Sequence, residues 1–202
     1  MVDTLEEWED YAPFAANPFG SRPVWIGYDP SHRGDSAGCV VLAPPVVAGG
    51  KFRILERHQW KGMDFATQAE SIRKLTEKYN VEYIGIDATG LGVGVFQLVR
   101  SFYPAARDIR YTPEMKTAMV LKAKDVIAVA VWNRRQRHRH HQLVMAIRKT
   151  MTSSGRSATY EANRSEEASH ADLAWATMHA LLNEPLTAGI STPLTSTILE
   201  FY

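Results

Sequence analysis

The sequence lacks the features that mark several large classes of protein. Its 202 residues contain no apolar run near the roughly 20 residues of a membrane-spanning helix, and no basic-then-apolar signal opens the chain. A single cysteine, Cys39, excludes a disulfide framework and favours a reducing cytosol as the setting. No internal repeat is visible. With 45% hydrophobic and 22% charged residues, the composition is that of one ordinary globular domain.

A large excess of positive charge is also missing, because 23 lysines and arginines nearly balance 22 aspartates and glutamates. Acidic residues are nevertheless absent between Asp125 and Glu161, a stretch that carries seven arginines and lysines. Such a block is typical of a phosphate-binding surface and equally of a solvated loop. Its last three members, Arg148, Lys149 and Arg156, are the candidate DNA-binding residues.

Nucleotide-binding motifs are absent as well. A Gly-x-x-x-x-Gly-Lys-Ser/Thr phosphate loop occurs nowhere in the chain, so we expect no ATP hydrolysis. The three glycines of residues 90–94 follow an apolar run, yet their spacing differs from that of a dinucleotide-binding turn. Close packing of the backbone between a strand and a helix explains these glycines better.

The apolar pattern predicts an α/β fold. Runs rich in β-branched and aromatic residues predict strands at 24–29, 37–43, 51–58, 83–87 and 109–112. Helical spacing of apolar residues predicts helices at 64–79, 91–102, 114–129 and 169–183. The first three strands, joined by short turns, form an antiparallel meander, and the later strands alternate with helices. We therefore expect a mixed sheet, in which parallel strands extend the meander, with helices on both faces.

Three regions are predicted along the chain. Residues 1–23 contain several prolines and no sustained periodicity, which is typical of a linker. Residues 24–185 contain all the predicted elements and form the domain. Residues 186–202 are rich in threonine, serine and proline and are predicted to be a loose C-terminal tail.

Two aspartates occupy equivalent places in the predicted sheet. Asp29 and Asp87 each end an apolar strand, and each follows a glycine two residues earlier. Acids at the carboxyl ends of neighbouring strands lie at the edge where ligands bind in open α/β sheets. Such carboxylates repel one another, and Mg²⁺ or Mn²⁺, which prefer oxygen ligands, relieve the repulsion. A role in beginning a turn explains each aspartate singly.

Asp172 is a third candidate, in the first turn of the last predicted helix. Small residues along this helix, Ala171, Ala174, Ala176 and Ala180, would let it approach a sheet closely. Stabilising the helix N-terminus is the structural explanation of the acid, worth about 0.3–1 kcal/mol. Completing a carboxylate cluster that shares two metal ions roughly 3.5–4 Å apart is the functional one. The local sequence leaves both explanations open.

Four short segments, taken in order, resemble a known family. Residues 25–30 (WIGYDP), 34–38 (GDSAG), 84–90 (IGIDATG) and 170–176 (HADLAWA) together resemble the C-terminal nuclease domain of the P2-like phage terminase large subunit. Each segment is weak evidence alone, whereas four in this order are specific. The resemblance implies a ribonuclease H-like fold and metal-dependent cleavage of double-stranded DNA during genome packaging.

The resemblance also implies roles for individual residues. Asp29, Asp87 and Asp172 are the implied catalytic acids and metal ligands, and three such acids can share two Mg²⁺ or Mn²⁺ ions. Two further candidates lie beside these motifs: Asp35 as an additional metal ligand, and His170 as an auxiliary residue that equally suits a helix start. The implied partners are double-stranded DNA, the terminase small subunit and the portal protein, in the cytoplasm of the host cell.

The chain departs from the family's pattern in two respects. Terminase large subunits carry a packaging ATPase before the nuclease domain, so residues 1–23 are expected to be the linker from a missing domain in a truncated chain.

The second departure is at residues 130–144, which form a polar run, rich in arginine and histidine, without an apolar stripe. We hypothesise that this run is read in a shifted frame, which sequencing of the encoding DNA tests. A basic DNA-binding loop and a histidine metal-binding tract are the alternatives.

Two other functions compete with the endonuclease. The chain could be a non-catalytic prophage remnant that keeps the fold and binds DNA or a partner. It could also be one half of a sugar-kinase-like or actin-like ATPase, which would share the first aspartate strand but would need a second lobe.

Overall fold

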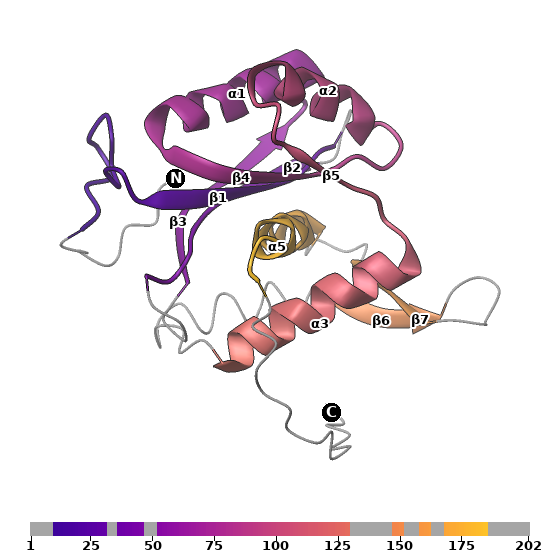
Figure 1. The fold of residues 1–202 in the computed structure, drawn as a ribbon. Coiled ribbons are helices and arrows are strands. Elements are labelled where there is room, and N and C mark those ends of the chain that lie inside the picture. Colours follow the sequence, from indigo (N-terminus) through magenta and orange to yellow (C-terminus); the bar gives the residue numbers. More distant parts are fainter. Residues whose placement is uncertain are drawn as a thin grey trace.

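The computed structural model describes most of the predicted domain (Figure 1). The described residues are 10–31, 36–46, 52–129, 147–151, 158–162 and 168–185. The predicted tail 186–202, the segment 130–144, Asp35 and Arg156 lie outside them. No helix among the described residues is both long enough and apolar enough to cross a membrane.

A five-stranded mixed sheet lies at the centre of the fold (Figure 1). The strands are β1 (Pro23–Asp29), β2 (Ser36–Ala43), β3 (Arg53–Lys61), β4 (Asn80–Asp87) and β5 (Arg107–Ile109). They lie in the order β3-β2-β1-β4-β5. The pairs β1–β2 and β2–β3 are antiparallel, whereas β4 is parallel to both β1 and β5. The predicted meander, extended by parallel strands, is confirmed.

Helices cover both faces of the sheet, as predicted. They are α1 (Phe65–Lys78), α2 (Gly92–Phe102), α3 (Pro113–Val129) and α5 (Ala168–Leu181). Figure 1 shows α1 and α2 on one face, α5 on the other, and α3 on the far side of α5. Alternation along β1 explains this, because Ile26 and Tyr28 join the core beneath α1 and α2, while Trp25 joins the core around α5.

The backbone of α5 lies almost directly against the sheet. A Cβ atom on Gly27 of β1 would lie 1.8 Å from the backbone oxygen of Ala176, and one on Gly85 of β4 would lie 2.9 Å from the backbone oxygen of His179. The helix itself has small residues at this contact, such as the buried Ala180. Glycine on the strands and alanine on the helix therefore allow the close approach that the sequence predicts.

Residues 10–22, which fall within the predicted linker, pack against the sheet. Tyr11 and Phe19 are buried in the core beneath α1 and α2. The carboxylate of Asp10 accepts hydrogen bonds of 2.7 and 2.9 Å from the guanidinium group of Arg53 on β3. The described part of this segment thus contributes to the core, while the domain boundaries themselves stay a prediction.

The last strand of the central sheet differs from its predicted position. A strand was predicted at 109–112, but β5 spans Arg107–Ile109 and pairs with the end of β4. The prediction was wrong because the chain leaves the sheet after this point. The backbone N–H of Tyr111 donates to the hydroxyl oxygen of Thr89 at 2.8 Å instead of continuing the ladder.

A second, two-stranded sheet was not predicted. β6 (Ile147–Met151) and β7 (Ala158–Ala162) pair in antiparallel fashion beside α3 (Figure 1). Both strands are short and rich in polar residues, so their alternation is weak, and β6 follows directly on the irregular arginine-rich run. The predicted DNA-binding residues Arg148 and Lys149 belong to β6, where their register partners are Glu161 and Tyr160.

Candidate active site

Asp29 and Asp87 end neighbouring parallel strands. The register pairs Tyr28 of β1 with Ile86 of β4, so the two aspartates that follow stand side by side. Because side chains alternate along a strand, each aspartate points to the same face as the glycine two residues before it. Those glycines face α5. Both carboxyl groups therefore lie on the α5 side, at the carboxyl-terminal edge of the sheet.

Asp172 approaches this pair from α5. Gly38 of β2 is the register partner of Asp29, and a Cβ atom on Gly38 would lie 2.5 Å from the backbone oxygen of Asp172. The helix begins at Ala168, which makes Asp172 its fifth residue, so the prediction of a first-turn position was wrong. Since the helix dipole acts within the first turn, helix stabilisation explains this acid less well than a role at the sheet edge.

The three carboxyl groups affect one another electrostatically. Burial raises the pKa of Asp29 well above its ordinary value, and the charges of Asp87 and Asp172 raise it further. Burial also raises the pKa of Asp87, although its carboxylate accepts a 2.8 Å hydrogen bond from the backbone N–H of Thr89. The structure thus brings the three predicted acids to one edge of the sheet, within electrostatic reach of Asp29.

Lys116, in the first turn of α3, provides a positive charge beside these acids. Its ammonium group lowers the pKa of Asp29 and Asp87 and so opposes the effect of their burial. The ammonium nitrogen lies 5.0 Å from the ring centroid of Tyr111 and 5.5 Å from that of Trp175. Both distances are within the range of a cation–π interaction.

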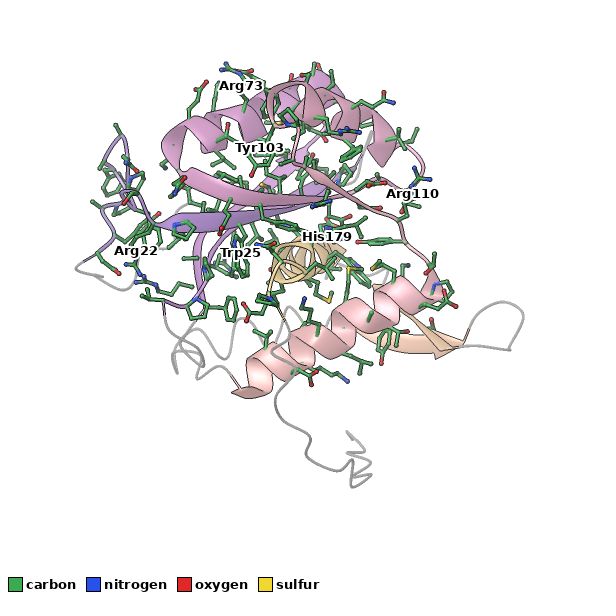
Figure 2. All side chains as sticks on the ribbon, viewed as in Figure 1. Arg22, Trp25, Arg73, Tyr103, Arg110 and His179 are labelled. Carbon is green, nitrogen blue, oxygen red and sulfur yellow. The ribbon has the colours of Figure 1, made fainter. Side chains whose placement is uncertain are left out.

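His179 connects this aromatic pair to the first strand. Figure 2 shows it on α5, beneath the sheet. Its Nδ1 atom lies 3.0 Å from the backbone oxygen of Tyr28, and its Nε2 atom lies 2.9 Å from the hydroxyl oxygen of Tyr111. Burial lowers the pKa of His179 to about 3. The neutral ring therefore donates from Nδ1 to the carbonyl before Asp29 and accepts at Nε2 from the Tyr111 hydroxyl.

The roles of Lys116, Tyr111 and His179 were not predicted from the sequence. Tyr111 and His179 are 68 residues apart, and no local pattern relates them. One usable signal lies on the last helix, where Asp172, Trp175 and His179 are spaced by three and four residues. That spacing places the two rings on the same helix face as the acid.

The residues at this edge fit divalent metal ions in their chemistry. Their oxygen donors suit Mg²⁺ or Mn²⁺, and the raised pKa of Asp29 reflects burial first and then the like charges of Asp87 and Asp172, which a cation would offset. Among the described residues, no three histidine, cysteine, aspartate or glutamate side chains already form a group that could hold a metal ion. The carboxylates would therefore have to approach one another further in order to share ions.

The other predicted site residues cannot be placed relative to these acids. Asp35 and Arg156 lie outside the described residues. His170 belongs to α5, and Arg148 and Lys149 belong to β6, but their side chains are not among those that the structure describes.

Comparison with known proteins identifies the family. The model of the terminase RNase H-like domain matches residues 26–184. The chain belongs to this family. Over its whole length it is 89% identical to the terminase ATPase subunit of Escherichia phage P2. It is also 43% identical, over 91% of its length, to the probable terminase ATPase subunit of Haemophilus phage HP1. The chain spans 34% and 30% of these two relatives, about a third of their length.

Solved structures of terminase nucleases share the fold. The large terminase nuclease of thermophilic phage G20c, solved with bound magnesium, aligns with a TM-score of 0.64 and 18% identity over 87% of this chain and 85% of that one. The large terminase nuclease domain of bacteriophage SPP1, solved with bound manganese, aligns with a TM-score of 0.54 and 12% identity over 87% of this chain and 93% of that one. The ribonuclease H-like fold implied by the sequence resemblance is confirmed.

Proposed function

We propose that this terminase domain is a metal-dependent endonuclease that cleaves double-stranded DNA by two-metal phosphodiester hydrolysis. The observation that carries the proposal is the geometry at the carboxyl-terminal edge of the sheet. Asp29 and Asp87 end adjacent parallel strands, and the backbone of Asp172 packs against Gly38, the register partner of Asp29. Three acids close enough to raise the pKa of one member are costly for a protein to keep together. Divalent cations are the ligands that make such an arrangement favourable.

Each acid has a distinct part in this proposal. Asp29 and Asp87 bind the ions from the ends of adjacent strands, and Asp172 binds them from α5. The hydrogen bond from the Thr89 backbone N–H orients the carboxylate of Asp87. When bound, Mg²⁺ or Mn²⁺ activates a water molecule and stabilises the charge that develops on the leaving oxygen. Asp35 is proposed as a further metal ligand and His170 as an auxiliary residue.

DNA is the proposed substrate, bound through its phosphates and largely without reading bases. Arg148, Lys149 and Arg156 are the proposed phosphate contacts. The relatives are subunits of phage terminases, and the nucleases of phages G20c and SPP1 were solved with magnesium and manganese. These similarities support the proposal that the domain acts together with a packaging ATPase, a terminase small subunit and a portal protein in the host cytoplasm.

Nicking of supercoiled plasmid tests the proposal. We expect the wild-type protein to nick the plasmid with Mg²⁺ or Mn²⁺ and not in EDTA. Replacing Asp29→Asn or Asp87→Asn should lower the rate by about 100-fold or more, because each removes charge from the ion site. Asp108→Asn is the matched control, since Asp108 is an exposed aspartate on the neighbouring strand β5. It should nick at the wild-type rate.

The outcomes separate the proposed function from its alternative. Nicking by Asp87→Asn at the rate of Asp108→Asn would refute the assignment of the site. A folded wild-type protein that binds duplex DNA, but nicks it with neither ion, would support the non-catalytic prophage remnant instead.

A further inference from the structure

Lys116 has a setting that the three acids alone do not explain. It is half-buried in the first turn of α3, and its backbone N–H donates to the Thr112 carbonyl at 2.9 Å. The Thr112 hydroxyl in turn accepts a 3.1 Å hydrogen bond from the backbone N–H of Met115, which fixes this turn as a helix N-cap does. The capped turn holds Lys116 in a set position next to Tyr111.

Two aromatic rings support the ammonium group of Lys116. The rings of Tyr111 and Trp175 have their centroids 5.2 Å apart, and the ammonium nitrogen lies within 5.5 Å of both centroids. Tyr111 is held in turn by its hydrogen bond to the buried His179. The platform thus joins the start of α3 to α5, the helix that carries Asp172.

The ammonium group keeps its hydrogen-bond donors available. Within the part of the chain that the structure describes, Lys116 takes part in no salt bridge, although its charge acts on Asp29 and Asp87. A cation–π contact uses the positive charge and leaves the three N–H donors of an ammonium group largely unused. Such a cation is suited to an incoming anion rather than to a fixed internal partner.

We propose that Lys116, held on the Tyr111–Trp175 platform, binds a phosphate of the DNA backbone beside the three acids. The inference rests on the proposed function, because it assigns a substrate contact within the same site. A phosphodiester that enters a cluster of carboxylates is repelled by them, so a fixed cation at this edge offsets part of that repulsion. Lysine binds phosphate as a point charge, and it needs no bidentate geometry.

In this arrangement Lys116 is a catalytic residue, and Tyr111 and His179 are positioning residues. The hydrogen bond from Tyr111 to His179 sets the plane of the ring on which the ammonium rests. The same imidazole donates to the Tyr28 carbonyl, directly before Asp29. One buried ring therefore sets the position of the cation relative to the first acid.

Salt-dependent binding of a fluorescent DNA duplex tests the phosphate contact without cleavage. The measurement is made in EDTA on the Asp29→Asn, Asp87→Asn protein, in which neutral side chains no longer attract the ammonium. Adding Lys116→Met should make the negative slope of log K against log salt shallower by about 0.9, the value for one lost phosphate contact. Adding Lys124→Met, an exposed lysine two turns later on α3, should leave the slope unchanged.

Cleavage by otherwise wild-type protein provides the second readout. Lys116→Met should cut plasmid about 100-fold more slowly at saturating DNA, comparable to loss of one charge-stabilising group, while Lys116→Arg should recover most of the rate. Tyr111→Leu, which removes the ring, should reproduce part of the loss, and Tyr111→Phe, which keeps the ring but loses the hydrogen bond to His179, should lose less than Tyr111→Leu. An unchanged salt slope in Lys116→Met would overturn the inference whether or not the wild type cuts DNA, whereas a wild type that never cuts overturns only the proposed function.

Discussion

The two faces of the central sheet are built from different kinds of residue. Beneath α1 and α2 the strands present large apolar side chains, such as Ile26, Tyr28, Ile84 and Ile86, all fully buried. Beneath α5 the corresponding positions near the carboxyl ends of β1 and β4 are glycines followed by aspartates. At these strand ends one face is held by side-chain packing and the other by the direct approach of two backbones. Farther along the same strands, Trp25, Val40 and Leu42 pack as side chains in the core around α5.

This difference shows how the fold positions a charged site. Bulky residues on a strand keep the backbone of a helix about a side chain's width away, so only a long side chain on that helix reaches the strand ends, as Gln68 of α1 does at the Ser31 carbonyl. With glycine on the strand, α5 lies close enough for Asp172 to reach the neighbourhood of Asp29. The packing of the α5 face is therefore a precondition of the site, whereas the opposite face mainly stabilises the domain.

The largest expected effect comes from breaking the backbone contact of α5. Gly27→Ala places a Cβ atom 1.8 Å from the Ala176 backbone oxygen, so the helix has to move away. We expect a loss of roughly 3 kcal/mol or more in the free energy of unfolding, at the upper end of overpacking effects. Urea unfolding followed by circular dichroism measures the midpoint and slope. Loss of nicking should accompany it, because Asp172 moves with the helix.

Gly94→Ala on the opposite face is the matched control for this substitution. Its Cβ atom would meet only the Phe65 ring, at 3.1 Å, and a side chain can shift where a backbone cannot. Alanine is also favoured over glycine inside a helix by about 1 kcal/mol. Equal losses of stability in the two variants would show that the faces do not differ as described.

Local sequence patterns predicted part of this difference between the two faces. Apolar runs ending in an aspartate predicted the ends of β1 and β4, since strand composition and strand termination are both local properties. Alternation of strands and helices then predicted the mixed sheet. The alanines of the last helix predicted a close approach, although the glycines opposite them were interpreted only as neighbours of the acids.

The sequence could not show the cationic and aromatic part of the site. Lys116, Tyr111 and His179 acquire their roles only when α3 and α5 pack together, which depends on contacts across tens of residues. Tyr111 was also placed in a strand, because its neighbours have strand composition, while in the structure its backbone bonds to Thr89. Tertiary contacts overrode local preference there.

A smaller effect is expected from two of the buried polar residues, one on each face of the sheet: His179 and Gln68. Both hold Tyr28, since His179 donates to its carbonyl and Gln68, on α1, accepts from its hydroxyl. His179→Phe should lower the free energy of unfolding by about 1–3 kcal/mol at pH 7, the cost of leaving buried partners unsatisfied. Gln68→Met, which also leaves the Ser31 and Met63 carbonyls without its amide, should cost a similar amount.

Acid pH should separate the two variants. Folding lowers the pKa of His179 from 6.5 to about 3, so the unfolded chain binds a proton that the folded protein excludes. Stability contributed by the neutral ring is present above pH 6.5 and is lost as the pH falls toward 3. His179→Phe should therefore show a shallower loss of Tm over this range than the wild type, and Gln68→Met should keep the wild-type slope. Parallel curves for all three proteins would contradict a buried neutral imidazole.

The smallest expected effect has the opposite sign and concerns Asp29 itself. Folding raises the pKa of this carboxyl, first through burial and then through the charges of Asp87 and Asp172, so its ionised form destabilises the folded protein. The penalty is absent below the unfolded pKa, about 4, and grows as the pH rises toward the folded value. In EDTA at neutral pH, Asp29→Asn should therefore raise Tm, by about 2–4 °C for each kcal/mol gained, and the gain should vanish near pH 4.

Added Mg²⁺ should reverse the order of the two Tm values, because a ligand that binds the folded state stabilises the wild type and not the Asp29→Asn variant. Asp108→Asn, which changes an exposed aspartate on β5, should have the Tm of the wild type at every pH, with and without Mg²⁺. If Asp29→Asn also has the wild-type Tm throughout, the three acids do not destabilise the folded protein by repelling one another. The proposed electrostatic difference between the two faces of the sheet is then wrong.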